Sequence, residues 1–280
     1  MKDMFAYSEA VRRMRQFFQE KKGFIEVPAQ ARQSILAACE DPATISQYIF
    51  SGINWPLPQT GQMWLEQELL ENPEVPGVFC ISTSYRNEPN PIPGRHDKIF
   101  PMFEFEAKGD IKDMIMLERQ LLIHLGFEQP RQHQIYGEEG HCYTYDRLCE
   151  ILEKDVLDAD DELMMAETIS NNVFIRDFPL RTHPFWNMKQ NGDVFNKVDV
   201  ILYGMETIGS AERSTNVDEM RKNFYTISDG EYANLLFNHF GRYRVEKELE
   251  QYFELEMFER FGGGIGLTRM TRAMKLAGLL

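Results

Sequence analysis

A proline-rich stretch between two strand-like runs constrains the fold of this chain more than any other feature. Residues 77–84 contain the run Val-Phe-Cys-Ile-Ser-Thr, and residues 99–108 form a second strand-like run. Residues 87–96, which lie between them, carry three prolines and a glycine. Proline removes a backbone donor and fixes its own φ angle, so this stretch can be neither a helix nor a central strand. The sequence therefore predicts a loop that joins two strands.

Helices and strands are predicted along the rest of the chain without strict alternation. In the second run, Phe103 and Phe105 fall on one face of the strand, with Glu104 and Glu106 on the other. The further expected elements are an amphipathic helix at 8–22 with Gly23 as its C-cap, strands at 24–27, 173–175 and 198–203, helices at 112–125 and 161–171, a largely helical stretch at 231–259, and a glycine-rich turn at 262–266 that leads into a helix at 267–276. This order favours an α+β fold, with an antiparallel β-sheet flanked by helices.

The composition limits the classes of partner. The 280 residues carry a formal net charge of −14. An acidic total argues against extensive RNA binding, because gripping phosphates requires a basic face, and an ATP site must concentrate its own cations. No apolar run approaches the ~20 residues of a membrane-spanning helix. The four cysteines form no C-x-x-C pair, so we expect no zinc ribbon. Four thiols without a signal peptide fit a reducing cytosol better than a disulfide framework, so we expect a cytoplasmic location.

The first candidate site is cationic and lies around the proline-rich loop. Arg86 follows the first strand-like run, and Arg95 and His96 follow the prolines. Guanidinium groups bind phosphates bidentately, and Phe100 could stack on a purine or on an arginine. The alternative interpretation is a charged hairpin with surface salt bridges.

The second candidate site is acidic. Asp199 and Glu206 are separated by a short strand and a turn, and Arg213 follows seven residues later. Such a carboxylate pair can hold Mg²⁺ against a triphosphate, and the arginine could meet a substrate carboxylate or amide. The alternative is a solvated acidic turn.

The third candidate site is the glycine run at 262–266 with Arg269 shortly after it. Glycines permit close approach of a ligand, and a helix N-terminus favours an anion. A cation in the first turn of a helix is unfavourable unless an anion offsets it. The run lacks the Gly-Lys-Ser/Thr ending of a Walker A loop, and it has no dinucleotide-type βαβ surroundings. By itself, it is more typical of a flexible turn.

Taken in order, these segments resemble the three signature motifs of class II aminoacyl-tRNA synthetases, most closely the asparaginyl and aspartyl (class IIb) branch. Residues of about 8–28 look like the first motif, about 79–108 like the second and about 261–276 like the third. The segments 59–63 and 177–186 match as well. The resemblance implies one class II synthetase-like catalytic domain over residues 1–280, with the first motif at a homodimer interface.

The resemblance also implies a role for each matching residue. ATP would be held by Arg86 at the α-phosphate, Glu88 at the adenine amino group, Phe100 against the ring, Arg95 and His96 at the outer phosphates, and Arg269 at the γ-phosphate. Mg²⁺ would be bound by Asp199 and Glu206, and the amino acid by Glu40, Gln62, Glu66, Glu104 and Arg213. Arg86 and Arg269 would be the catalytic residues. No general base is needed, because the substrate carboxylate is already ionised and attacks in line.

Three departures from the family pattern bear on function. The first motif begins within ten residues of Met1, so we expect no anticodon-binding domain, and tRNA remains a possible partner only without anticodon reading. Leu65 stands where aspartyl enzymes carry a lysine, and Thr268 stands where the third motif usually has an acidic residue. The glycine run also resembles that of ammonia-dependent asparagine synthetase.

Three functions fit these observations. The first is an AMP-forming ligase, similar to asparaginyl-tRNA synthetase, that activates asparagine, aspartate or a related amino acid and passes it to tRNA, a carrier protein or a small molecule. The second is an aspartate–ammonia ligase, in which ammonia attacks the adenylate. The third is a non-catalytic, synthetase-like sensor of an amino acid or nucleotide, although Arg86, Glu88, Glu206 and Arg269 are all present.

Overall fold

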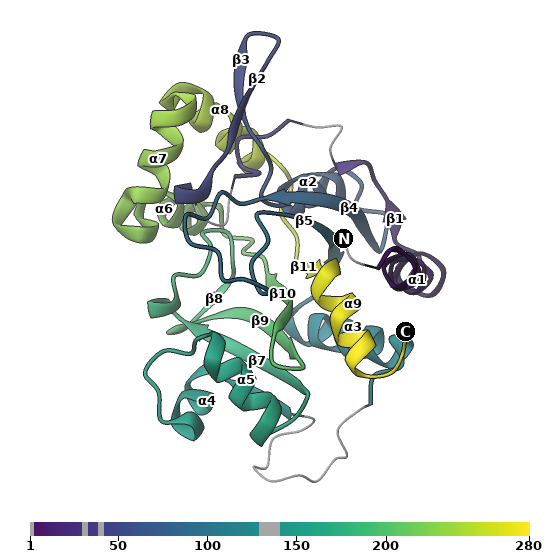
Figure 1. The fold of residues 1–280 in the computed structure, drawn as a ribbon. Helices are drawn as coiled ribbons and strands as arrows, with labels where there is room; N and C mark the ends of the chain where they lie inside the picture. Colours follow the sequence, from purple (N-terminus) through teal and green to yellow (C-terminus); the bar gives the residue numbers. More distant parts are fainter. Residues whose placement is uncertain (1–2, 30–32, 39–41, 129–140) are drawn as a thin grey trace.

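The computed structural model of the chain describes residues 3–29, 33–38, 42–128 and 141–280. Its centre is a nine-stranded sheet in the order β1-β4-β5-β11-β10-β9-β7-β6, with β8 paired to β9 (Figure 1). The strands are β1 (Ile25–Glu26), β4 (Gly77–Tyr85), β5 (Ile99–Lys108), β6 (Cys142–Thr144), β7 (Asn172–Pro179), β8 (Gln190–Asn191), β9 (Val194–Leu202), β10 (Glu206–Glu212) and β11 (Arg260–Gly266). A separate hairpin consists of β2 (Gln47–Phe50) and β3 (Ile53–Pro56).

The predicted fold class is confirmed. Neighbouring strands of the sheet are antiparallel except at its two edges, where β1 pairs with β4 and β6 pairs with β7 in parallel. The strands on either side of the proline-rich loop, β4 and β5, pair over their full length from Gly77↔Ala107 to Tyr85↔Ile99. The loop therefore leaves the end of a long hairpin, as the sequence predicts.

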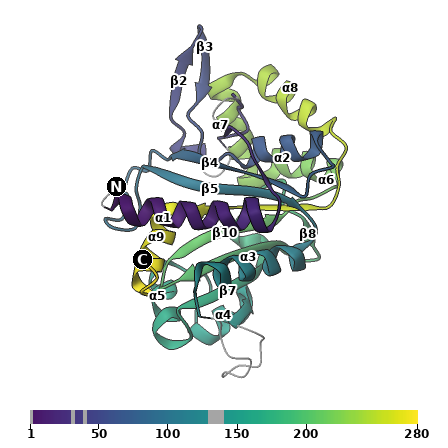
Figure 2. The same ribbon diagram turned by 90° about the vertical axis from the view of Figure 1, so that its right-hand side faces the viewer.

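The helices lie on both faces of the sheet. One face is covered by α1 (Met4–Arg15), which continues as a π-helical turn (Gln16–Lys21), and by α3 (Ile111–Leu125) and α9 (Leu267–Leu276); Figure 2 views the molecule from this side. The other helices are α2 (Gln62–Glu71), α4 (Tyr145–Leu152), α5 (Ala159–Thr168), α6 (Val217–Thr226), α7 (Glu231–Phe240) and α8 (Arg242–Phe253). They surround the opposite face, with α6–α8 grouped near the β2–β3 hairpin (Figure 1).

The main hydrophobic core lies between the sheet and α1, α3 and α9. The ring of Phe18 lies 4.9 Å from that of Phe103 and 5.2 Å from that of Phe105, measured between centroids. Glu104 and Glu106 project from the same strand toward the opposite face, where both are fully buried. The predicted alternation along β5 is thus confirmed, and it separates an aromatic core from a face that carries charge.

The prediction of a glycine-rich turn is wrong, because the run forms the central strand β11 between β5 and β10. A Cβ atom at Gly262 would lie 1.9 Å from Oε1 of Glu106, and one at Gly263 would lie 2.6 Å from Cβ of Ser210. The glycines are therefore required by side chains of the neighbouring strands. None of the glycines in this strand has a positive φ angle, so no turn depends on them.

Several predicted boundaries also need correction. The stretch 231–259 is two helices, α7 and α8, which are separated at Gly241, where φ is 86°. The first helix begins earlier than expected, because the Asp3 side chain accepts a hydrogen bond from the N–H of Ala6 and caps it. Within the described residues, no helix is long and apolar enough to cross a membrane.

Candidate functional site

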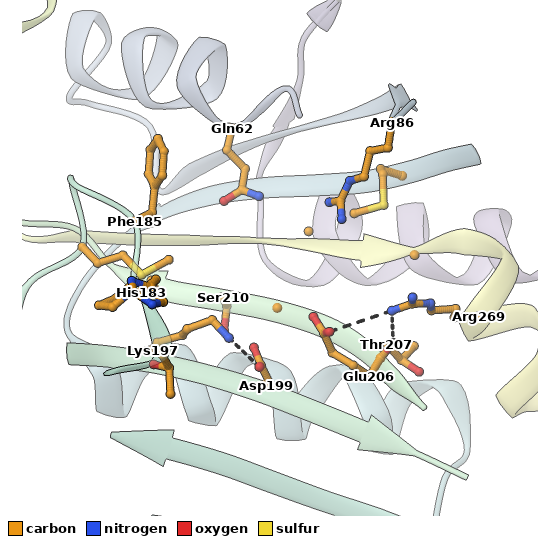
Figure 3. Close-up of a pocket in the computed structure, with 18 of the residues that line it drawn as sticks. Gln62, Arg86, His183, Phe185, Lys197, Asp199, Glu206, Thr207, Ser210 and Arg269 are labelled. Atoms are coloured by element: carbon orange, nitrogen blue, oxygen red, sulfur yellow. Dashed lines mark hydrogen bonds and ion pairs between the residues drawn. The ribbon is translucent and has the colours of Figure 1, made fainter. Parts of the chain in front are cut away.

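A cavity of about 560 Å³ opens on the charged face of the sheet, and we call it the central cavity. Its walls come from the ends of β4 and β5, from β9, β10 and β11, from the start of α9 and from the loop after β7 (Figure 3). Ten of the sequence-predicted site residues line it: Gln62, Arg86, Glu88, Arg95, His96, Phe100, Asp199, Glu206, Arg213 and Arg269. The structure thus brings together residues from all three candidate sites.

The proline-rich loop supplies cations and an aromatic ring to one wall. The guanidinium carbon of Arg86 lies 5.5 Å from the centroid of Phe100. The N–H of Arg86 donates to the carbonyl of Lys98 at 2.8 Å, which holds the two ends of the loop together. Nδ1 of His96 lies 2.9 Å from a carboxylate oxygen of Glu88. The loop therefore presents a flat ring, a guanidinium group and a carboxylate at one end of the cavity.

Glu162 of α5 links this loop to the opposite wall, and no sequence pattern predicted its place in the site. One of its carboxylate oxygens lies 2.6 Å from Nη2 of Arg95, and the other accepts a hydrogen bond of 2.6 Å from the N–H of Glu206. Burial raises the pKa of Glu162, while Arg95 opposes the shift. Its sequence position, in the first turn of a helix capped by Asp158, indicates ordinary helix capping, so no local signal marked it.

Asp199 on β9 and Glu206 on the neighbouring strand β10 direct their carboxylates toward the same place. A Cβ atom at Gly209 would lie 3.0 Å from Oε1 of Glu206 and 3.5 Å from Oδ1 of Asp199, so both carboxylates stand over this glycine. Oδ1 of Asp199 is buried without a hydrogen-bond partner in the described part of the chain. Burial raises the pKa of Asp199 to about 7, although Lys197 opposes the shift.

These two carboxylates fit one hard cation with oxygen ligands. An unpartnered buried oxygen beside a second carboxylate is the arrangement that such an ion completes. No group of three or more His, Cys, Asp or Glu side chains within the described residues is placed to hold a metal ion. A cation here would therefore take its remaining ligands from water or from a bound substrate.

Arg269 projects into the cavity from the first turns of α9. Its Nη1 donates to the backbone carbonyl of Glu206 at 2.7 Å and lies 3.9 Å from a carboxylate oxygen of the same residue (Figure 3). These contacts provide the negative charge that a cation near a helix N-terminus requires. They also leave the Arg269 side chain 28% exposed at the cavity wall.

Arg213 and Gln62 meet at the other end of the cavity. Nη2 of Arg213 donates to Oε1 of Gln62 at 2.6 Å. The same guanidinium group pairs with Glu106 and lies 3.6 Å from Glu66. Burial raises the pKa of Glu106, and Arg213 opposes that shift. The arrangement offers both hydrogen-bond donors and acceptors to a small polar group.

Two predicted site residues do not line the central cavity, and a third cannot be placed. Glu104 lies beneath it and accepts hydrogen bonds from the hydroxyls of Thr60 and Ser82 and from the N–H of Gly61. Glu66 is fully buried and pairs with Arg260, Tyr252 and Asn187. Glu40 lies outside the described residues.

The comparisons with known proteins identify the family and the fold. The profile of the family described as "tRNA synthetases class II (D, K and N)" matches residues 1–278. No curated protein matches the sequence.

Many solved structures share the fold. The asparaginyl-tRNA synthetase from Pyrococcus horikoshii complexed with asparaginyl-adenylate is similar over 96% of this chain, with a TM-score of 0.73 and 19% identity. The asparaginyl-tRNA synthetase from Entamoeba histolytica in complex with asparaginyl-adenylate covers 98%, with a TM-score of 0.69 and 18% identity. A putative aspartyl-tRNA synthetase from Leishmania major Friedlin is similar over 98% of this chain, with a TM-score of 0.72 and 16% identity. The chain spans 64%, 63% and 63% of their lengths, respectively.

Proposed function

Because this chain belongs to the class II tRNA synthetases (D, K and N), we propose that it is an AMP-forming ligase core that activates an amino acid with ATP and Mg²⁺. The observation that carries the proposal is the convergence of Arg86, Arg269 and the Asp199–Glu206 pair on one cavity. The three guanidinium groups of Arg86, Arg95 and Arg269 suit an anion with several charges. The carboxylate pair suits the cation that would accompany it.

The proposed nucleotide position follows from the chemistry of the walls. The adenine would lie against Phe100, with Glu88 accepting from its amino group. Arg86 would hold the α-phosphate, and Arg95, His96 and Arg269 would hold the outer phosphates. Mg²⁺, when bound by Asp199 and Glu206, would neutralise part of the charge on the phosphates.

The chemical step requires positioning and charge stabilisation more than proton transfer. One oxygen of the amino-acid carboxylate attacks the α-phosphorus, the bond from this phosphorus to the bridging oxygen breaks, and pyrophosphate leaves. The attacking carboxylate is already ionised, so no base removes a proton. Arg86 would stabilise the charge that develops at the α-phosphate, because a guanidinium group fixed in place before the reaction needs no reorganisation.

The amino acid would lie between Arg213 and Gln62, next to the α-phosphate position. We propose asparagine, aspartate or a related amino acid, because both residues can hydrogen-bond a side-chain carbonyl. The acceptor would be tRNA or a smaller nucleophile, and transfer to ammonia would make the chain an aspartate–ammonia ligase. We further propose a homodimer, since Phe5 on α1 and Ile25 on the edge strand β1 are 77% and 49% exposed.

Exchange of labelled pyrophosphate into ATP tests the proposal. The purified chain, ATP, Mg²⁺ and each amino acid in turn should give exchange with one amino acid or a small group of them. Arg86→Ala should lower the exchange rate by about 10²-fold or more, whereas Arg12→Ala on the exposed side of α1 should leave it unchanged. An absence of exchange with every amino acid, under conditions where the protein is folded, would contradict the proposed function.

A further inference from the structure

Lys197 places a fixed positive charge beside the carboxylate pair, and no role assigned above requires it. It lies on β9, two residues before Asp199, and its side chain points into the central cavity (Figure 3). Nζ of Lys197 lies 2.5 Å from Oδ2 of Asp199 and 3.8 Å from the centroid of the Phe178 ring. The side chain is 23% exposed, so the ammonium group is held by both neighbours yet open to the cavity.

The ammonium group takes one of the oxygens that a metal ion would use. Oδ2 of Asp199 accepts from Lys197, while Oδ1 has no partner within the described residues and faces the space shared with Glu206. An ammonium group is a compact cation with three donors. It therefore satisfies one side of the carboxylate and leaves the other side for a ligand.

The summed charge of Asp199, Glu206 and Lys197 indicates how many divalent cations this wall of the cavity needs. Asp199 and Glu206 together carry two negative charges when ionised, and Lys197 reduces the sum to one. A single divalent cation then makes this wall of the cavity positive toward phosphates. Without Lys197, one divalent cation would bring the sum only to zero, and a second would be needed to make the wall positive.

We propose that Lys197 is a built-in counter-cation of the Asp199–Glu206 pair, which limits the pair to one divalent cation at a time. The inference rests on the proposed function only in assuming that this cation accompanies ATP. Lys197 is a positioning residue in this scheme, since it acts through Asp199. A purely structural role, in which Lys197 only packs on Phe178, would leave metal binding unchanged when its charge is removed.

Binding of Mn²⁺ to the nucleotide-free chain, followed by electron paramagnetic resonance of the free ion, tests this directly. Lys197→Met keeps a long side chain but removes the charge, so it should bind Mn²⁺ about tenfold more tightly than the wild type, because a cation next to the site no longer repels the metal. Lys197→Arg should behave like the wild type. Asp199→Asn should cancel the gain when combined with Lys197→Met.

A second measurement counts the ions. In the presence of ATP, the wild type should bind one Mn²⁺ at the protein carboxylates, and Lys197→Met should bind one more. Equal Mn²⁺ affinity and stoichiometry in the two proteins would overturn the proposal, as would a gain that persists in the double variant. If Lys197→Met does not fold by circular dichroism, Lys197→Gln replaces it, with the same expectations.

The two proposals can fail separately. Wild-type protein that exchanges no pyrophosphate, together with a tenfold gain of Mn²⁺ affinity in Lys197→Met, would reject amino-acid activation and retain the role of Lys197. Normal pyrophosphate exchange by the wild type, together with unchanged Mn²⁺ affinity in Lys197→Met, would retain amino-acid activation and reject the role of Lys197.

Discussion

Two groups of charged side chains lie on the same face of the sheet, and they differ in how completely their members are paired. We call the first the buried cluster, which consists of Glu66, Glu106, Arg213, Tyr252 and Arg260. We call the second the cavity cluster, which consists of Arg95, Glu162, Asp199, Glu206 and Arg269. Both contain arginines and carboxylates in similar numbers.

The buried cluster is closed on itself except at Arg213, which also lines the central cavity and donates to Gln62. Arg260 is fully buried and donates to Glu66, to the hydroxyl of Tyr252 and to the carbonyl of Ser214. The cavity cluster is closed on one side only: Arg269 remains 28% exposed and Asp199 keeps an unpartnered oxygen. Charged side chains that are fully paired with one another hold secondary-structure elements together. Charged side chains that are only partly paired can still bind a ligand. Residue type alone cannot distinguish the two cases.

The largest expected effect is on stability, in the buried cluster. Glu66→Ala would leave Arg260 buried without its carboxylate, and breaking a buried pair in this way costs about 3–5 kcal/mol of the free energy of unfolding. Urea unfolding measures this, and Glu74→Ala, at an exposed position, should change the value by less than ~0.5 kcal/mol. A loss below about 1 kcal/mol would mean that the cluster is not closed.

The next effect is on activity, in the cavity. Arg86→Ala should lower the rate of pyrophosphate exchange about 10²–10³-fold, as the removal of one preorganised charge-stabilising donor does elsewhere. Its urea midpoint should stay close to that of the wild type, because Arg86 lines the cavity and is not part of the buried cluster. A parallel loss of stability and rate would place Arg86 with the structural charges.

A smaller effect is expected at the bridge between the loop and β10. Glu162→Gln would weaken the contacts to Arg95 and to the N–H of Glu206, so ATP should bind about tenfold more weakly, in line with one charged hydrogen bond. Calorimetric titration with ATP measures the dissociation constant. Glu167→Gln, on the exposed side of the same helix, is the matched control, and equal affinity in the two variants would contradict a role for the bridge.

The last effect depends on pH and concerns a buried carboxylate on the opposite face of the sheet. Burial of Glu118 in α3 raises its pKa from 4.5 to about 8, although the Ser210 hydroxyl opposes the shift. A pKa raised by folding gives stability that is complete below pH 4.5 and is lost as the pH rises toward 8. Glu118→Gln should therefore match the wild type near pH 4.5 and exceed it by several kcal/mol at pH 8, at about 1.4 kcal/mol for each unit of the pKa shift.

Thermal unfolding across this pH range is the measurement for Glu118. The exposed Glu74→Gln variant should follow the wild-type curve throughout. A Glu118→Gln curve that runs parallel to the wild type at every pH would show that the carboxyl group does not titrate as its burial predicts.

The sequence was sufficient where the pattern is local. The period-two alternation of phenylalanine and glutamate along β5 predicted which face would carry the core, and the prolines predicted the loop that carries Arg95. The convergence of Arg86, Asp199 and Arg269 on one cavity was expected from the resemblance to the class II synthetases.

The sequence was insufficient to predict the role of a residue where that role depends on a side chain from a distant part of the chain. Gly262 needs to be glycine because Glu106, more than 150 residues earlier, occupies the space of its side chain. Glu66 was expected at the amino acid but is paired with Arg260, a contact that spacing does not encode. Lys197 and Glu162 carry no motif, and only the packing of β9 and α5 brings them to the cavity.

A crystal structure of the chain with ATP and Mg²⁺ is the most direct test of the cavity cluster as a nucleotide site. The triphosphate should lie within hydrogen-bond distance of Arg86 and Arg269, the adenine should lie against Phe100, and one Mg²⁺ should touch Asp199 and Glu206. A nucleotide bound elsewhere on the chain, with these side chains still paired as they are now, would contradict the assignment.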